Sequence, residues 1–156
     1  MPISGHNAQC TLFGALNVRN GRRVLLRRAH ACAADFQAFL RHLRHDHYRS
    51  GQPIWLLVDK APCHVAAGSL ALAAALNITL LWLPPQCSEL NAMDQLFKDL
   101  KRLIAANRQF QTIDEEADYA EHWILALTAR QALRKASVLS EDFWLKDFLQ
   151  NFWLPT

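Results

Sequence analysis

Two short apolar runs constrain the fold of this chain more than any other feature of its sequence. Ile54–Val58 and Ile78–Leu83 are almost continuously apolar, which is typical of strands that are covered on both faces of a sheet. Asp59 follows the first run, and Pro84 and Pro85 end the second, because proline cannot donate to a strand ladder. We therefore expect two strands of one sheet, joined by a right-handed helical connection.

Each run is followed by an aspartate that suits a cation site. Asp59 stands at the carboxyl end of its expected strand, where the ligands of open α/β sheets collect. Asp94 is expected on a helix capped by Asn91 or Ser88, so a second carboxylate can share the ion. Carboxylate oxygens are ligands that Mg²⁺ and Mn²⁺ prefer. Taken singly, each aspartate also suits a loop or a helix start, where an acid complements the helix dipole.

The remaining periodicities indicate a mixed α/β fold. Residues 9–18 and 22–28 are predicted strands, with Asn20-Gly21 as a two-residue hairpin turn in which both residues take positive φ. The spacing of apolar residues predicts helices over residues 31–48, 64–76, 91–104 and 112–132, and a last helix from Ser140 to Trp153. The order is therefore a hairpin, a helix, two strands with a helix between them, and further helices.

Two segments resemble a known family. Asp59–His64 and Leu83–Lys101 are similar to the catalytic core of mariner-superfamily transposases, specifically bacterial insertion-sequence members. That family uses three acidic residues, and the 34 residues between Asp59 and Asp94 match its spacing of the second and third. The resemblance implies an α/β, ribonuclease H-like mixed sheet with flanking helices. It also implies a two-metal site for Mg²⁺ or Mn²⁺, in which Asp59 and Asp94 are the catalytic metal ligands.

The chain departs from the family pattern at the expected site. Lys60 stands where the family usually has Asn, and an ammonium beside Asp59 would compete with a metal ion for that carboxylate. Asp94 replaces the usual Glu, which shortens the reach of the side chain by one methylene. The family's first acid lies on its first strand, and here only Asp35 and Asp46 precede Asp59, neither in an expected strand. We therefore expect an incomplete metal site.

The resemblance to the family also implies a domain organisation. Residues 1–156 are expected to be one partial transposase catalytic domain that lacks its first strand and is truncated at the N-terminus. The ribonuclease H-like core is expected at about residues 9–108, and C-terminal helices at residues 112–156.

The activity that the resemblance implies is DNA transposition by a DDE-type endonuclease of a mobile element. Such an enzyme cleaves the terminal inverted repeats of an insertion sequence and transfers the strand to target DNA, and we expect this chain to be inactive alone. Lys98, Lys101, Arg102 and His64 are candidate DNA contacts, with an exposed helix face or a solvated loop as the alternative. The rival functions are a non-catalytic DNA-binding or dimerising transposase remnant and a stand-alone nuclease. Partners would be DNA, a second copy of the chain or the missing N-terminal part.

Composition sets further limits. Residues 1–50 hold eight Arg against Asp35 and Asp46, a net charge of +6, whereas the remainder carries −3, which suggests either contact with a polyanion or a solvated face. The sequence has no uncharged apolar stretch of membrane-spanning length and no signal-peptide pattern, so we expect a protein of the bacterial cytoplasm, associated with the nucleoid. A zinc site is disfavoured, because its candidate ligands lack close spacing. Those candidates are His6, Cys10, Cys63, His64 and Cys87.

Overall fold

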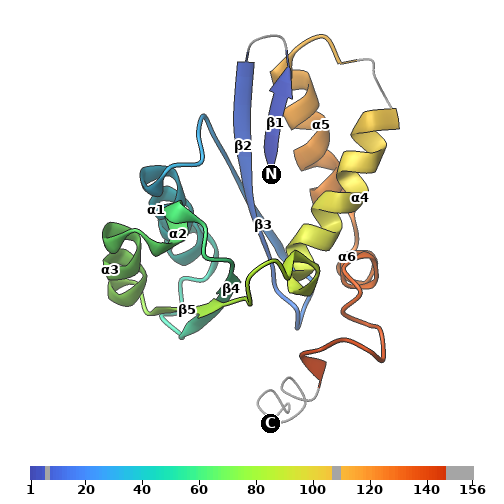
Figure 1. Ribbon diagram of the computed structural model, residues 1–156. Coiled ribbons are helices and arrows are strands. Elements are labelled where there is room, and N and C mark those ends of the chain that lie inside the picture. The colour runs from blue at the N-terminus through green and yellow to red at the C-terminus, as the bar shows by residue number, and fades with distance from the viewer. Residues whose placement is uncertain (6–7, 107–109, 147–156) are drawn as a thin grey trace.

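The fold consists of two small sheets and the helices that pack on them (Figure 1). The computed structural model describes residues 1–5, 8–106 and 110–146. In the first sheet, β1 (Pro2–Gly5), β2 (Ala8–Leu16) and β3 (Arg23–Arg28) are antiparallel in the order β1-β2-β3. In the second, β4 (Ile54–Val58) and β5 (Ile78–Trp82) are parallel, with Ile54 opposite Ile78. The prediction that the two apolar runs are neighbouring strands of one sheet is confirmed.

The helices follow the predicted order, with several changes at their boundaries. They are α1 (Ala33–Arg41), the π-helix η1 (His42–His47), α2 (Pro62–Val65), α3 (Ala67–Ala75), the 3₁₀ turn η2 (Ser88–Leu90), α4 (Ala92–Ala106), α5 (Ile113–Ala126) and α6 (Ala129–Lys135). Within the described residues, no helix is long and apolar enough to cross a membrane.

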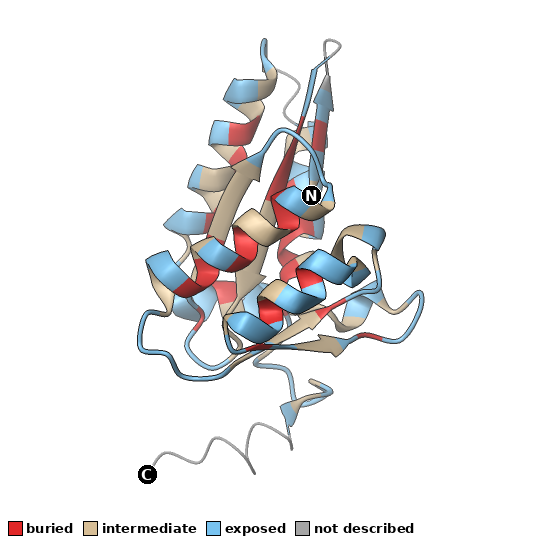
Figure 2. Ribbon diagram, turned by 90° about the vertical axis from the view of Figure 1, so that its left-hand side faces the viewer, coloured by how far each residue is buried: buried red, intermediate tan, exposed pale blue. Residues whose placement is uncertain are grey.

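The first sheet is covered on both faces, and this arrangement follows from the two-residue period of its strands. On one face, Leu12 belongs to a buried cluster with α4, α5 and α6. On the other face, Val24 belongs to a second cluster with α1, α3 and β5. Figure 2 shows the buried positions running along the faces that the helices and strands share. Gly14 lets α4 approach β2 closely, since a Cβ there would lie 2.7 Å from Met93 Cε.

The predicted hairpin of β2 and β3 is confirmed, but its turn and one further strand differ from the prediction. The turn after β2 is a longer loop closed by Asn17 N–H donating to Arg22 O, and only Gly21 of the predicted pair has positive φ. The Asn17 side chain accepts from the backbone N–H groups of Arg19 and Asn20, so it stabilises this wider turn. Strand β1 was also missed, because Pro2–Gly5 has no apolar run.

The predicted helix over residues 112–132 is two helices. Thr112 caps α5, because its hydroxyl accepts from Glu115 N–H. Leu127 is extended, and Thr128 then begins α6 with a reciprocal capping box to Gln131. The predicted last helix is not formed over its first residues, since Ser140–Leu145 lie in turns and a bend, and its residues 147–153 lie outside the described part of the chain.

Arginines from the basic N-terminal segment hold distant elements together. Arg44 is buried and donates to four backbone carbonyls, among them Leu76 O at 2.8 Å and Gln52 O at 2.9 Å. Arg27 on β3 pairs with three acids on α5, with Asp118 Oδ1 at 2.6 Å from Arg27 Nη2. Arg23 donates to carbonyls at the end of α5. Several of the N-terminal arginines therefore form contacts within the fold.

Candidate active site

Asp59 directly follows β4, at the carboxyl end of the strand. The Asp59 side chain is 64% exposed, and its Oδ1 accepts from the backbone N–H of Ala61 at 3.2 Å. His64 Nδ1 lies 2.9 Å from both the Oδ1 and the backbone carbonyl of Asp59. Since a carbonyl can only accept, this His64 nitrogen carries a hydrogen and donates it to Asp59.

The His64 ring packs against α1. The ring packs on Phe36 with 4.3 Å between the centroids, and Phe36 is itself buried. The histidine side chain is only 18% exposed. It is therefore a fixed partner of Asp59, and its candidate role in contacting DNA would need its other ring nitrogen.

Asp94 lies in the first turn of α4 and is half-buried. Asn91 caps this helix, because its Oδ1 accepts from the backbone N–H of Met93 at 3.0 Å. The Gln95 side chain also donates to Glu89 O at 3.0 Å, which ties the helix to η2. The apolar residues whose spacing predicts this helix form its buried face, since Met93, Leu96, Phe97 and Leu100 are all buried. Packing of this face fixes the direction in which Asp94 projects.

The two carboxylates line one cleft of about 330 Å³. Its floor and walls are the end of β4 and the loop between β5 and α4. The lining residues are Asp59, Lys60, Ala61, Leu83, Pro84, Pro85, Gln86, Cys87, Ser88 and Asp94. Gln86 has φ +59°, so the proline-led loop turns sharply on its way to Asp94. The structure thus brings the two sequence-predicted acids to the same edge of the second sheet.

The two acids also influence each other electrostatically. Burial, and after it the negative charge of Asp59, raise the pKa of Asp94 above its usual range. Positive charge on the Met1 amine, Lys101 and His64 acts in the opposite direction on the pKa of Asp94. A divalent cation between the two carboxylates would offset the repulsion between their negative charges. Carboxylate oxygens are also the hard ligands that Mg²⁺ and Mn²⁺ prefer.

Among the residues that the structure describes, no third acid lines the cleft. In the part of the chain that the structure describes, no group of three or more His, Cys, Asp or Glu side chains is arranged to hold a metal ion. None of the strands β1 to β5 contains an acidic residue. Asp35 lies in α1 and is bonded to Arg28 and Cys32, away from this role. The candidate zinc ligands are not brought together either, and His6 lies outside the described residues.

The other candidate residues lie on the exposed side of α4. Lys98, Lys101 and Arg102 are all exposed, and Lys101 is close enough to Asp94 to lower its pKa. Arg102 makes a 3.6 Å ion pair with Asp99 on the same helix. These cations therefore stand beside the acidic cleft, on the helix that carries Asp94.

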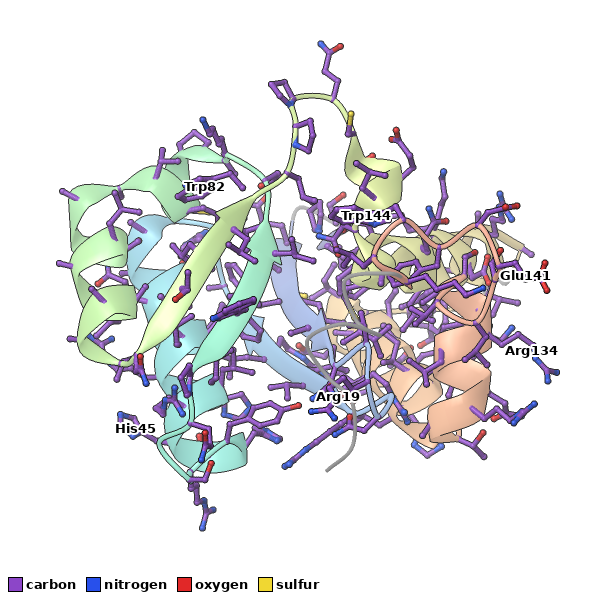
Figure 3. The ribbon with its side chains drawn as sticks, turned by 90° about the horizontal axis from the view of Figure 1, so that it is seen from below. Arg19, His45, Trp82, Arg134, Glu141 and Trp144 are labelled. Carbon is purple, nitrogen blue, oxygen red and sulfur yellow. The ribbon has the colours of Figure 1, made fainter. Side chains whose placement is uncertain are left out.

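Sequence reasoning missed one support of the cleft loop. The Trp144 indole N–H donates to Leu90 O at 2.9 Å, so the C-terminal segment holds the end of η2 just before the Asn91 cap (Figure 3). No short-range pattern could reveal this bond, because 54 residues separate its partners.

Comparison with solved structures shows where this fold occurs. The catalytic domain of Mos1 mariner transposase superposes with a TM-score of 0.67 at 19% identity, covering 87% of this chain and 72% of that chain. The same domain with raltegravir and Mg gives the same TM-score. The simian T-cell lymphotropic virus intasome in complex with PP2A regulatory subunit B56 gamma gives 0.56 at 15% identity, covering 82% of this chain and 47% of that chain. The predicted α/β, ribonuclease H-like fold is confirmed.

Sequence comparison identifies the family. No curated protein sequence matches the chain. In the Mos1 mariner paired-end complex with Mn, the chain covers only 41% of the transposase. The family model for DDE superfamily endonucleases matches residues 2–115, which is most of the 156 residues. The chain therefore belongs to the DDE superfamily of endonucleases.

Proposed function

We propose that this chain is part of the catalytic domain of a transposase that cuts DNA at the ends of a mobile element and joins them to target DNA. The observation that carries the proposal is the convergence of Asp59 and Asp94 on one cleft, in a chain of the DDE endonuclease family. The solved relatives support it, since they include Mos1 transposase with its left transposon end.

Asp59 and Asp94 would hold Mg²⁺ or Mn²⁺ in this cleft. Mos1 catalytic domains have been solved with Mg and with Mn, which supports this choice of ion. Such an ion, when bound, activates an attacking oxygen and stabilises a leaving oxygen at phosphorus. His64 and the Ala61 N–H orient the Asp59 carboxylate by two hydrogen bonds. Burial of Asp94 strengthens its interaction with a cation, because the local dielectric is low.

The described residues supply only two of the three carboxylates that this chemistry uses in the family. Residues 1–156 by themselves are therefore expected not to cut or join DNA, and the missing acid would have to come from another segment or another chain. The same observation favours a second function, a non-catalytic DNA-binding or dimerising remnant that interferes with an intact transposase. The two functions differ in whether the cleft retains metal affinity.

The test of the cleft is Mn²⁺ binding, followed by electron paramagnetic resonance of the free ion. We expect weak binding by the native chain that falls at least 10-fold in Asp59→Asn and in Asp94→Asn. Asp99→Asn is the matched control, since Asp99 lies one turn further along α4 and makes only a surface ion pair. Equal Mn²⁺ binding by the native chain and the three variants would show that the cleft does not bind the ion.

A nicking assay on DNA with the element's own ends tests the activity. No product is expected from residues 1–156 with Mn²⁺. Cleavage that disappears in Asp59→Ala would show that these residues hold a complete site, and the two-carboxylate argument would be wrong.

DNA binding is expected through the exposed cations of α4. Lys98→Glu with Lys101→Glu should weaken binding to a labelled duplex at low salt and reduce the slope of log K against log salt by about 0.9 for each phosphate that is no longer neutralised. Arg130→Glu with Arg134→Glu is the control with an equal change of charge, because both residues are exposed cations on α6, outside the cleft lining (Arg134 in Figure 3). Equal weakening in both proteins would mean that binding depends on net charge alone.

A further inference from the structure

Two histidines of the π-helix η1 face each other outside the acidic cleft. His42 Nε2 and His47 Nε2 are 3.2 Å apart, and the two rings are nearly perpendicular, at 79° with centroids 4.7 Å apart. His42 and His47 are five residues apart, which is the spacing of the backbone hydrogen bonds of a π-helix. In an α-helix the same spacing would separate them by about 140° around the axis. The π-helical backbone is therefore what brings the two nitrogens together.

The hydrogen bonds of this pair run in one direction. Arg22 Nη2 lies 3.0 Å from His47 Nδ1, and a guanidinium can only donate, so this nitrogen accepts. In neutral His47 the hydrogen is therefore on Nε2, and it is donated to His42 Nε2. His42 in turn carries its hydrogen on Nδ1 and donates it to Asp46 Oδ2 at 2.7 Å. A single hydrogen thus occupies the space between two imidazole nitrogens.

We propose that His42 and His47 form a chelating site for a transition-metal ion of the Zn²⁺, Ni²⁺ and Cu²⁺ class, bound through both Nε2 atoms in place of that hydrogen. Two Zn–N bonds of about 2.0–2.1 Å at a near-tetrahedral angle hold their nitrogens about 3.3 Å apart. The observed separation of 3.2 Å is already that of a chelate. His42 is 23% exposed, so water can complete the coordination.

Asp46 gives His42 the second contact that metal-bound histidines commonly have. A carboxylate that accepts from Nδ1–H fixes the tautomer and the ring orientation, and it makes Nε2 a stronger ligand. The bond to Asp46 is present before any ion arrives. His42 therefore needs no rearrangement to bind.

The contact of Arg22 with His47 disfavours metal binding. When His47 binds through Nε2, its hydrogen moves to Nδ1 and would face the Arg22 guanidinium, so this contact must open. Arg22 also packs over the Tyr48 ring, 5.1 Å from its centroid, and it can remain there after it releases His47. Imidazole ligands beside a guanidinium favour ions that bond strongly to nitrogen, and they exclude Mg²⁺. The site is therefore separate in place and in ion class from the Asp59 and Asp94 cleft.

Isothermal titration of the whole chain with Ni²⁺, in a buffer that does not chelate it, tests the site. We expect His42→Ala and His47→Ala each to weaken binding more than 10-fold. Asp46→Asn should weaken it about 10- to 100-fold, the range for loss of such a supporting carboxylate. His45→Ala is the matched control, because His45 belongs to the same π-helix and is exposed at the edge of the molecule (Figure 3).

A variant that binds Ni²⁺ more tightly cannot be explained by misfolding, so it gives a second test. Arg22→Gln should bind Ni²⁺ more tightly than the native chain, since the amide oxygen can accept from His47 Nδ1–H where the guanidinium cannot. Native-like unfolding midpoints without metal would show that each variant is folded. The proposal is overturned if His42→Ala and His47→Ala bind Ni²⁺ like the native chain, or if His45→Ala loses as much affinity as they do. Unchanged or weaker binding by a folded Arg22→Gln would also overturn it.

Discussion

At the scale of single residues, the acids of this chain divide into two kinds. Asp35 is buried in the first turn of α1 and fully engaged, since it accepts from Arg28 Nε at 2.8 Å and from the Cys32 thiol at 2.9 Å. Asp59 and Asp94 instead line a cleft, where Asp59 is bonded to Ala61 and His64 and is still 64% exposed. Residue type therefore does not separate the two kinds, whereas the hydrogen-bond partners do.

Asp35→Asn should destabilise the protein at pH 7 by about 1.5–3 kcal/mol, because the amide would place hydrogens against the donors that now contact a charged group. The Cys32 thiol and then Arg28 lower the pKa of Asp35 below its usual 3.8. A lowered pKa stabilises the fold above the usual value, and this contribution is lost as the pH falls through the folded-state pKa. Urea unfolding at several pH values should therefore show the deficit of Asp35→Asn shrinking in acid.

The control for this prediction is Asp99→Asn. Asp99 makes one long surface pair with Arg102, so its replacement should change the free energy of unfolding by less than about 1 kcal/mol. A deficit of Asp35→Asn that stays constant down to pH 2 would contradict the role of its charge.

At the scale of elements, two glycines with the same backbone conformation have different surroundings. Gly21, in the turn between β2 and β3, has φ +76°, and a Cβ there would lie 2.5 Å from the backbone oxygen of Ala129 in α6. Gly51 has φ +77°, and a Cβ there would meet nothing within 4 Å. The hairpin turn is therefore in direct contact with the start of α6, whereas the turn before β4 is open.

Gly51→Ala should cost about 1–2 kcal/mol, the strain of a left-handed conformation in an L residue. Gly21→Ala should cost this amount and about 1–3 kcal/mol more, because a helix backbone cannot move aside as a side chain can. Chemical denaturation of the two variants measures the difference. Equal costs would show that α6 does not press on the hairpin.

At the scale of the whole molecule, the first sheet joins two buried clusters. Phe36 belongs to the cluster with α1, α3 and β5, and Leu96 belongs to the cluster with α4, α5 and α6. Both side chains are almost completely buried. Strands β2 and β3 contribute alternate side chains to the two clusters, so loss of either cluster exposes the same strands.

We therefore expect one cooperative unfolding transition. Phe36→Ala should cost about 3–5 kcal/mol and Leu96→Ala about 2–5 kcal/mol, and each should shift the whole transition. Circular dichroism and tryptophan fluorescence should give coincident urea curves for both variants. Two separated transitions in either variant would mean that the clusters unfold independently.

The sequence by itself determined the elements whose signal is local. Apolar runs specified β4 and β5, the helical stripe specified the buried face of α4, and Thr112 specified the start of α5. The spacing of Asp59 and Asp94 also predicted a DDE-type endonuclease, and the family model confirms this superfamily. The first three signals lie within a few residues of the element that they predict. The fourth is a number of residues, which can be counted along the chain.

Only the tertiary structure decided which side chains meet. Arg27 could have been a polyanion contact, but it pairs with Asp118, 91 residues away. The break between α5 and α6 lies where Arg23 donates to Leu127, 104 residues away. The facing of His42 and His47 depends on a π-helical turn where the sequence predicts an ordinary helix. Such pairings follow from how the packed elements are placed, and no periodicity along one element contains that information.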